Sequence, residues 1–212
     1  MISKRLQEIA SLIEKNKVVF DVGSDHALLP CFLIENNITN KVYASEVNEG
    51  PYQKVIETIN KHHLQDKIIP FFTDGLNNCP DDVDIVVIAG MGYYTIEHIL
   101  NDTVVNKYDY IIVQSNSDVD LLRKYISDHN YTIEDEKVVK DGFYYQIVKF
   151  SGKYHDKYSY LDIKYGPVNL KNKDKIFVDY LNDLKDRLIK INVNANKDDY
   201  KQTIREIEEF LV

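Results

Sequence analysis

The stretch Val18-Val-Phe-Asp-Val-Gly-Ser-Asp-His-Ala-Leu-Leu-Pro30 decides the fold class of this chain. The apolar run Val18 to Val22 is rich in β-branched residues and predicts a buried strand, and Gly23 predicts a tight turn after it. The residues from Ala27 to Glu35 predict the helix that follows. A strand, a turn and a helix in this order favour an α/β fold whose turn lies close to a ligand, since glycine lets the backbone approach it.

The charges around this turn indicate which ligand it holds. The dinucleotide fingerprint needs three glycines, and only Gly23 is present here. Asp25 would repel a pyrophosphate, whereas it attracts the ammonium and sulfonium groups of S-adenosylmethionine. Glu46 ends the next apolar run, where a carboxylate can accept both hydroxyls of a ribose. The pattern therefore favours S-adenosylmethionine over NAD, with an ordinary buried strand and Gly-Asp turn as the alternative for the motif taken alone.

Three later segments also place polar residues directly after an apolar strand. They end in Thr73-Asp74-Gly75, Gly90-Met91-Gly92 and Gln114-Ser115-Asn116. Ligands of an open parallel sheet bind beyond the carboxyl ends of its strands, so these residues should converge on one crevice, where Asp74 can accept the adenine amino group. Taken singly, each is more often a turn former or a helix cap. The cofactor-binding residues that we expect are Asp21, Gly23, Ser24, Asp25, His26, Glu46, Val47, Asp74, Gly75, Ala89, Gly90 and Met91.

Composition limits the size, location and partners of the protein. With 212 residues, 44% of them hydrophobic, the chain suffices for one α/β domain and a small appendage. It has no 18-residue apolar run and no signal-peptide pattern at its start, which predicts a cytoplasmic protein that does not enter the membrane. Neither the two cysteines nor the six histidines have metal-ligand spacing, so no metal is expected. We expect a monomer, with a dimer as the alternative.

The second half of the chain predicts an antiparallel hairpin followed by helices. Strand-like runs at 131–139 and 144–150 flank Lys140-Asp141-Gly142, a hairpin turn signal. Apolar residues then recur at steps of four and three on two helical segments joined by the polar residues 192–199, which predicts an antiparallel coiled-coil hairpin. A parallel sheet that ends in an antiparallel hairpin is typical of class I methyltransferases, so we expect a methyltransferase domain at 1–165 and a helical hairpin at 166–212. The hairpin could be a substrate arm, a stabilising appendage or a dimer contact.

Several motifs in order along the chain carry a family resemblance. They are Ser3-Lys-Arg-Leu6, Asp21-Val-Gly-Ser-Asp-His-Ala27, Leu29-Pro30-Cys31, Gly50-Pro51, Asp74-Gly75, Ile88-Ala-Gly-Met-Gly92 and Tyr165-Gly-Pro167. Together they resemble the bacterial TrmK family, tRNA adenine-N1 methyltransferases that act at position 22. The resemblance implies a class I, Rossmann-like methyltransferase domain with a C-terminal coiled coil, using S-adenosylmethionine and tRNA. The chain departs from the family at Tyr93-Tyr94, where a further glycine is usual, and at Gln114-Ser115-Asn116, where Gln-Pro-Asn is usual.

The loop after residue 89 is also consistent with a ring-nitrogen acceptor. It lacks the Asn/Asp-Pro-Pro-Tyr sequence that methyltransferases acting on exocyclic amines share, and adenine N1 needs chiefly alignment with the methyl group. Asp25 is the candidate to accept the proton that leaves the methylated base, although binding the cofactor ammonium is an equal alternative. Methylation of another RNA or of a small molecule, and cofactor-dependent RNA binding without transfer, are the alternative functions.

The acidic charge of the chain means that any contact with tRNA must be local. Residues 1–150 hold 14 basic and 23 acidic side chains, whereas residues 151–212 hold 12 and 11. The field of the protein therefore repels phosphates at long range. Two adjacent tyrosines could stack on a flipped adenine, and a few lysines could contact phosphates, although a solvated surface role is the commoner one for each. The expected substrate-binding residues are Lys4, Arg5, Tyr93, Tyr94, Asn116, Lys171, Lys173 and Lys175.

Overall fold

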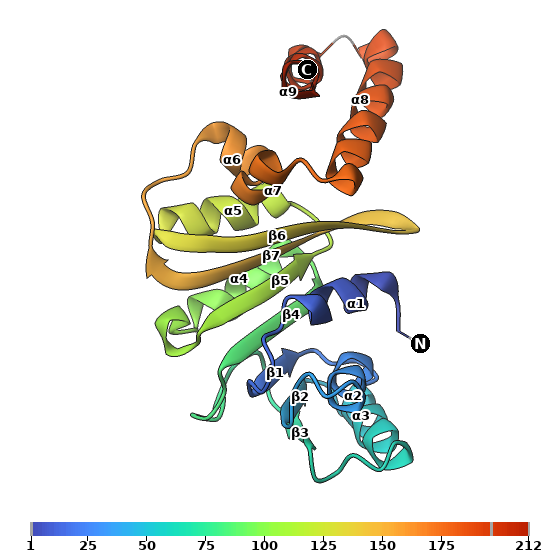
Figure 1. Ribbon diagram of the computed structural model, residues 1–212, viewed down its shortest axis with the longest axis vertical. Helices are drawn as coiled ribbons and strands as arrows, with labels where there is room; N and C mark the ends of the chain where they lie inside the picture. Colours follow the sequence, from blue (N-terminus) through green and yellow to red (C-terminus); the bar gives the residue numbers. More distant parts are fainter. Residues whose placement is uncertain (1, 196, 212) are drawn as a thin grey trace.

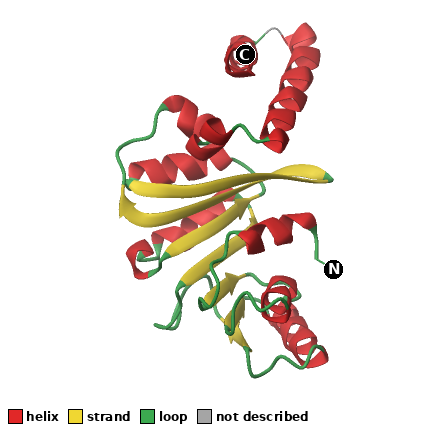
Figure 2. Ribbon diagram, viewed as in Figure 1, coloured by secondary structure: helices red, strands yellow, loops and turns green. Residues whose placement is uncertain are grey.

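A mixed sheet organises the computed structural model, which describes residues 2–195 and 197–211 (Figures 1 and 2). The order across the sheet is β3-β2-β1-β4-β5-β7-β6. The first five strands in this order are parallel, and β7 pairs antiparallel with both β5 and β6. The strands are β1 (Val19–Val22), β2 (Val42–Glu46), β3 (Ile68–Phe72), β4 (Ile85–Met91), β5 (Tyr110–Ser115), β6 (Tyr131–Asp141) and β7 (Phe143–Tyr154).

Helices cover both faces of this sheet because adjacent strand residues point to opposite faces. On one face, alternate strand residues such as Val19 and Ile112 pack against helices α1, α2 and α3. On the other face, their neighbours Phe20 and Ile111 pack against α4 and α5. The helices of these two layers are α1 (Lys4–Ser11), α2 (Leu28–Glu35), α3 (Glu49–Lys61), α4 (Tyr93–Asn101) and α5 (Val119–Asp128). A short 3-10 helix, Val105–Lys107, lies between α4 and β5.

Local sequence signals explain where these elements begin. The hydroxyl of Ser3 accepts the backbone N–H of Leu6, as predicted for a helix cap. The turn of the predicted hairpin falls at Gly142, whose φ of 73° suits a residue without a side chain. The two hairpin strands are longer than the sequence predicted, because both reach the turn and β7 also continues past Phe150 to Tyr154.

Among the described residues, the helices after the hairpin are α6 (Tyr160–Tyr165), α7 (Pro167–Asn172), α8 (Lys175–Ala195) and α9 (Asp198–Leu211). Helices α6 and α7 were not predicted, although Ser159 and Asp162 form a capping box at the start of α6. The predicted polar connector is shorter than expected, since α8 continues to Ala195 and α9 begins at Asp198. Asn196, within that connector, lies outside the described residues.

The helical hairpin is present, but a coiled coil is not confirmed. Phe177 and Leu181 on α8 and Ile207 on α9 are buried, and they pack with Val138 of β6 and Tyr165 of α6. Farther along α8, Ile191, which belongs to the apolar repeat that predicted the coiled coil, is 46% exposed. Figure 1 shows α8 from the side and α9 end-on, so their axes are steeply inclined to each other. The two helices pack on each other and, through Phe177, Leu181 and Ile207, also on Val138 and Tyr165.

Candidate active site at the carboxyl edge of the sheet

The turn after β1 is held tightly between the ends of β2 and β4. Gly23 has a φ of +68°, and a Cβ at this position would lie 2.5 Å from the Met91 side chain of β4. The backbone N–H of Ser24 donates to the carbonyl of Ser45 on β2 at 2.9 Å. The Ser24 hydroxyl donates to the carboxylate of Asp21. Glycine is therefore required here both by the backbone conformation and by the close approach of β4.

Glu46 links the end of β2 to the same turn. Its Oε1 accepts the backbone N–H of Asp25 at 2.5 Å, and the residue is 8% exposed. Burial raises the pKa of Glu46 above its ordinary value, and the hydrogen bond from Asp25 opposes that rise. The carboxylate is therefore fixed in position at the place where the sequence predicted a ribose contact.

Asp21 is the most strongly perturbed carboxyl group of the site. It is 5% exposed, and burial raises its pKa to about 7, with the charge of Glu46 contributing in the same direction. The hydrogen bond from Ser24 opposes this rise. Two acidic groups beside one turn give the site an electrostatic preference for a cationic ligand.

A hydrogen-bond network around Gln114 fixes the loop at the end of β4. Gln114 is fully buried, and its Oε1 accepts both the guanidinium of Arg5 and the backbone N–H of Gly90, the latter at 3.2 Å. The side chain of Asn116 donates to the carbonyl of Gly90 at 2.7 Å and accepts from Gln114 at 3.1 Å. The loop after β4 is thus held to α1 and to the end of β5.

These elements enclose a cavity of about 440 Å³, a volume typical of small-molecule sites. It is lined both by acidic groups and by apolar side chains of α1 and α2, so a ligand with a cationic part and an apolar part suits it. The convergence predicted from the strand ends is present here for β1, β2 and β4. The lining residues are Arg5, Leu6, Asp21, Gly23, Ser24, Asp25, Leu28, Leu29, Glu46, Pro51, Ala89, Gly90 and Met91.

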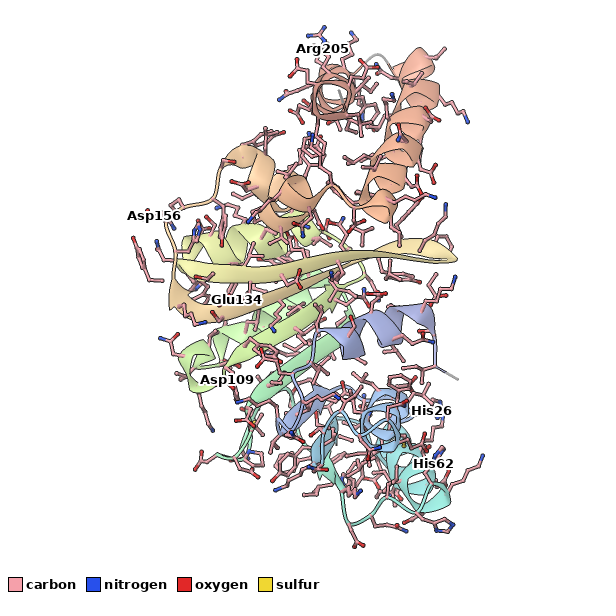
Figure 3. All side chains as sticks on the ribbon, in the orientation of Figure 1. His26, His62, Asp109, Glu134, Asp156 and Arg205 are labelled. Atoms are coloured by element: carbon pink, nitrogen blue, oxygen red, sulfur yellow. The ribbon has the colours of Figure 1, made fainter. Side chains whose placement is uncertain are left out.

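The remaining predicted cofactor residues do not line this cavity. His26 lies in the turn before α2, with its Nε2 3.7 Å from the carboxylate of Asp25 (Figure 3). Val47 follows Glu46 and is 50% exposed. Asp74 and Gly75 line a separate small cavity beyond β3. Their cofactor contacts stay predictions.

The predicted substrate residues are spread more widely. Tyr93 is 6% exposed, packs in the core and donates a hydrogen bond to Glu97, which does not suit the predicted stacking role. Tyr94 is 71% exposed, and its stacking on the adenine stays a prediction. Asn116 borders a second cavity, of about 500 Å³, between the end of β5 and α8.

The predicted lysines Lys4, Lys171, Lys173 and Lys175 are all exposed. Lys173 also has a structural partner, because it donates to the carbonyl of Phe210 at 3.0 Å and its ammonium lies over the ring of that residue. The phosphate contacts of all four lysines stay predictions.

Sequence reasoning missed several residues of the site. Leu6, Leu28, Leu29 and Pro51 form walls of the cavity. Leu6, Leu29 and Pro51 stand in the motifs of the family resemblance, but an apolar side chain does not by itself indicate contact with a ligand. Gln114 was noted as polar after a strand, but its central place in the network needs Arg5, which is 109 positions away. Within the described residues, no group of three or more metal-ligating side chains is close enough to hold a metal ion. Nor is any helix there long and apolar enough to span a membrane.

The residues of the cavity fit S-adenosylmethionine. Carboxylates at Asp21 and Asp25 suit its positive charges, Glu46 suits a ribose diol, and leucine side chains suit the apolar surface of an adenine. The sheet order and this site define the class of protein, a class I methyltransferase. A family profile described as a methyltransferase domain matches residues 2–148.

Comparison with individual proteins narrows the class further. The chain is 31% identical over 187 residues to the tRNA (adenine(22)-N(1))-methyltransferase of Bacillus subtilis, covering 84% of this chain and 78% of that protein. TrmK of M. capricolum, solved with the cofactor product S-adenosyl-homocysteine, is 31% identical with a TM-score of 0.82, over 99% of this chain and 96% of that one. The Streptococcus pneumoniae protein Sp1610, solved with S-adenosyl-L-methionine, is 31% identical with a TM-score of 0.90. That match covers 100% of both chains. The chain belongs to the family of tRNA (adenine(22)-N(1))-methyltransferases.

Proposed function

We propose that this protein transfers the methyl group of S-adenosylmethionine to N1 of adenine 22 in tRNA. The observation that carries the proposal is the cavity at the carboxyl edge of the sheet, where Asp21, Glu46 and Met91 meet in a chain related over most of its length to the B. subtilis enzyme. When bound, S-adenosylmethionine supplies an electrophilic methyl group. The residues of the chain have to bind it, orient the base and accept a proton.

The network around Gln114 supports N1 as the acceptor. The loop Ala89-Gly90-Met91-Gly92 has no side-chain carbonyl, and the amide groups of Gln114 and Asn116 are already engaged with each other and with Gly90. An exocyclic amine would need an acceptor from this loop, whereas the in-plane lone pair of N1 needs only alignment. Orientation can supply roughly 7 to 11 kcal/mol of such a barrier.

Asp25 is the proposed proton acceptor. Attack by N1 forms the N1–CH₃ bond and breaks the methyl–sulfur bond, which leaves a positive charge on the base until its amino group loses a proton. The Asp25 side chain is 75% exposed and lines the mouth of the cavity, so it can reach solvent and a bound base. Binding the cofactor ammonium remains the alternative role for this carboxylate.

The test is methylation of an unmodified tRNA transcript that has adenine at position 22. We expect mass spectrometry to map one methyl group to N1 of that base, and a matched transcript with guanine at position 22 to gain none. A methyl group at another nucleotide, or transfer only to a small molecule, would contradict the substrate. Cofactor binding without any transfer would favour an RNA-binding module instead.

We also propose that the protein is a cytoplasmic monomer. In this proposal, residues 1–165 form the catalytic domain and the helical hairpin at 166–212 binds tRNA.

A further inference from the structure

The closed end of the β6–β7 hairpin overhangs the catalytic edge of the sheet. Ser115, the last residue of β5, pairs with Gln146 of β7. Because β7 runs antiparallel to β5, Phe143 lies three residues beyond that edge, roughly 10 Å at the usual rise of a strand. Figure 1 shows this hairpin end projecting past the arrowhead of β5, on the side of α1.

Phe143 is presented on the same face of the hairpin as the cofactor cavity. Tyr145 and Ile147 pack in the core beside α1, whereas Tyr144 packs with the residues of α8. Side chains alternate along a strand, so Phe143 lies on the side of Tyr145. The guanidinium of Arg5, which lines the cavity, lies 5.3 Å from the Tyr145 ring centre.

Contacts on both faces hold this hairpin end rigid. On one side, the backbone N–H of Arg5 donates to the carboxylate of Asp141 at 3.2 Å. On the other, the hydroxyl of Tyr144 donates to Asp183 of α8 at 2.7 Å, and Lys140 donates to the same carboxylate at 3.3 Å. A phenyl ring on such a support loses little conformational freedom when a ligand stacks on it.

We propose that Phe143 is a tRNA-binding residue that stacks on a base next to the target adenine, an inference that rests on the tRNA substrate proposed above. The residue is 76% exposed, so its ring is accessible to a ligand at this end of the hairpin. Unpaired RNA bases are commonly bound by stacking on aromatic rings. Stacking also needs no positive charge, which suits a domain whose net charge repels phosphates.

The first experiment compares Phe143→Ala with Tyr154→Ala in full-length protein. Tyr154 is a matched control, because it is also 76% exposed on β7 but lies at the opposite end of the strand. Figure 3 labels Asp156, the hydrogen-bond partner of Tyr154, on the far side of the molecule from the hairpin end. We expect Phe143→Ala to weaken tRNA binding by roughly 5- to 150-fold, the range for one stacked base. Tyr154→Ala should change it less than twofold, and neither variant should alter S-adenosylmethionine affinity.

Salt dependence separates stacking from an electrostatic effect. The weakening caused by Phe143→Ala should be the same at 50 and 200 mM salt, because the substitution removes no counterion-releasing group. A changed salt slope, an unchanged tRNA affinity, or an equal weakening in Tyr154→Ala would overturn the proposal. Sedimentation is run alongside, and a wild-type dimer that Phe143→Ala dissociates would assign this side chain to self-association instead.

Phe143→Trp provides a direct readout, since the chain contains no tryptophan. Titration with tRNA should quench the fluorescence of this single indole and leave that of Tyr154→Trp unchanged. Unquenched fluorescence in a Phe143→Trp protein that still binds tRNA would also overturn the inference. If Phe143→Trp shows this quenching but the wild-type protein methylates another nucleotide, adenine 22 is not the target, whereas the role of Phe143 in tRNA binding stands.

Discussion

Replacement of Glu46 gives the sharpest test of the cofactor site. Its carboxylate is buried at the end of β2, faces the cavity and accepts the backbone N–H of Asp25. Glu46→Ala removes a charged acceptor from both the turn and the ribose. Hydrogen bonds to charged groups contribute about 1.5 to 3 kcal/mol, so S-adenosylmethionine should bind roughly 10- to 150-fold more weakly.

Glu46→Gln separates the two roles of this side chain. The amide keeps an oxygen for the N–H of Asp25 but loses the charge and one acceptor, so the weakening should fall to roughly 2- to 10-fold, as for neutral hydrogen bonds. Isothermal titration calorimetry measures the dissociation constant, and thermal unfolding by circular dichroism checks the fold. Glu49→Ala, an exposed glutamate at the start of α3, is the matched control. Wild-type affinity in Glu46→Ala would remove this residue from the site and refute the ribose assignment.

Three further variants test the electrostatics of the protein. For ligand-free protein, folding raises the pKa of Asp21 to about 7, so the native state binds the extra proton and loses stability as pH rises from about 4 through 7. Asp21→Asn has no carboxyl group to titrate and therefore lacks this effect. In urea unfolding, the free energy of unfolding of Asp21→Asn minus that of the wild type should increase over this pH range, by at most on the order of 4 kcal/mol. A difference that does not change with pH would contradict the burial of this charge. Lys171→Glu combined with Lys175→Glu should weaken tRNA binding and reduce its salt slope by about 0.9 for each phosphate that is no longer neutralised, whereas an unchanged slope would make these lysines ordinary surface residues. Glu136→Ala should reduce the free energy of unfolding by about 3 to 5 kcal/mol, because it leaves the guanidinium of Arg123 buried without its partner; wild-type stability would contradict this.

Most of the parallel sheet and the cofactor edge could be predicted because their signals are local. Gly23 marks its own turn, Ser3 caps its own helix, and Glu46 ends its own strand. The rule that ligands bind beyond the carboxyl ends of parallel strands then brings these residues together without any knowledge of tertiary contacts. The cavity lined by Asp21, Glu46 and Met91 has this origin.

The parts that could not be predicted depend on packing between distant positions. The steps of four and three in the C-terminal segment predicted two helices correctly, but a helical period does not say what the apolar face packs on. Phe177 and Leu181 pack with Val138 and Tyr165 in addition to Ile207 of α9. The exposure of Tyr94 and the burial of Tyr93 likewise depend on how α4 packs on the sheet, and adjacent positions in the sequence gave no basis for choosing between them.

The buried ion pair of Arg123 and Glu136 also explains how the C-terminal helices are joined to the sheet and to α5. The Nε of Arg123 on α5 lies 2.7 Å from Glu136 of β6, and both side chains are almost completely buried. Glu136 also accepts the backbone N–H of Val168 at the start of α7, at 3.0 Å. Gly166 has a φ of +95°, and a Cβ there would lie 2.4 Å from the Glu136 carboxylate. The glycine of Tyr165-Gly-Pro167 therefore allows the backbone to approach this carboxylate closely.

This junction determines how a role of the helical hairpin in tRNA binding has to be tested. Removing the chain after residue 165 would expose Val138 and leave Glu136 without the N–H of Val168, so an inactive protein would reflect unfolding as readily as a missing tRNA-binding surface. Exposed side chains such as Lys171 and Lys175 can be changed without disturbing the junction. A change in tRNA affinity and its salt slope, at constant stability and constant S-adenosylmethionine affinity, therefore identifies direct binding of tRNA, whereas parallel decreases in all four quantities identify a structural role.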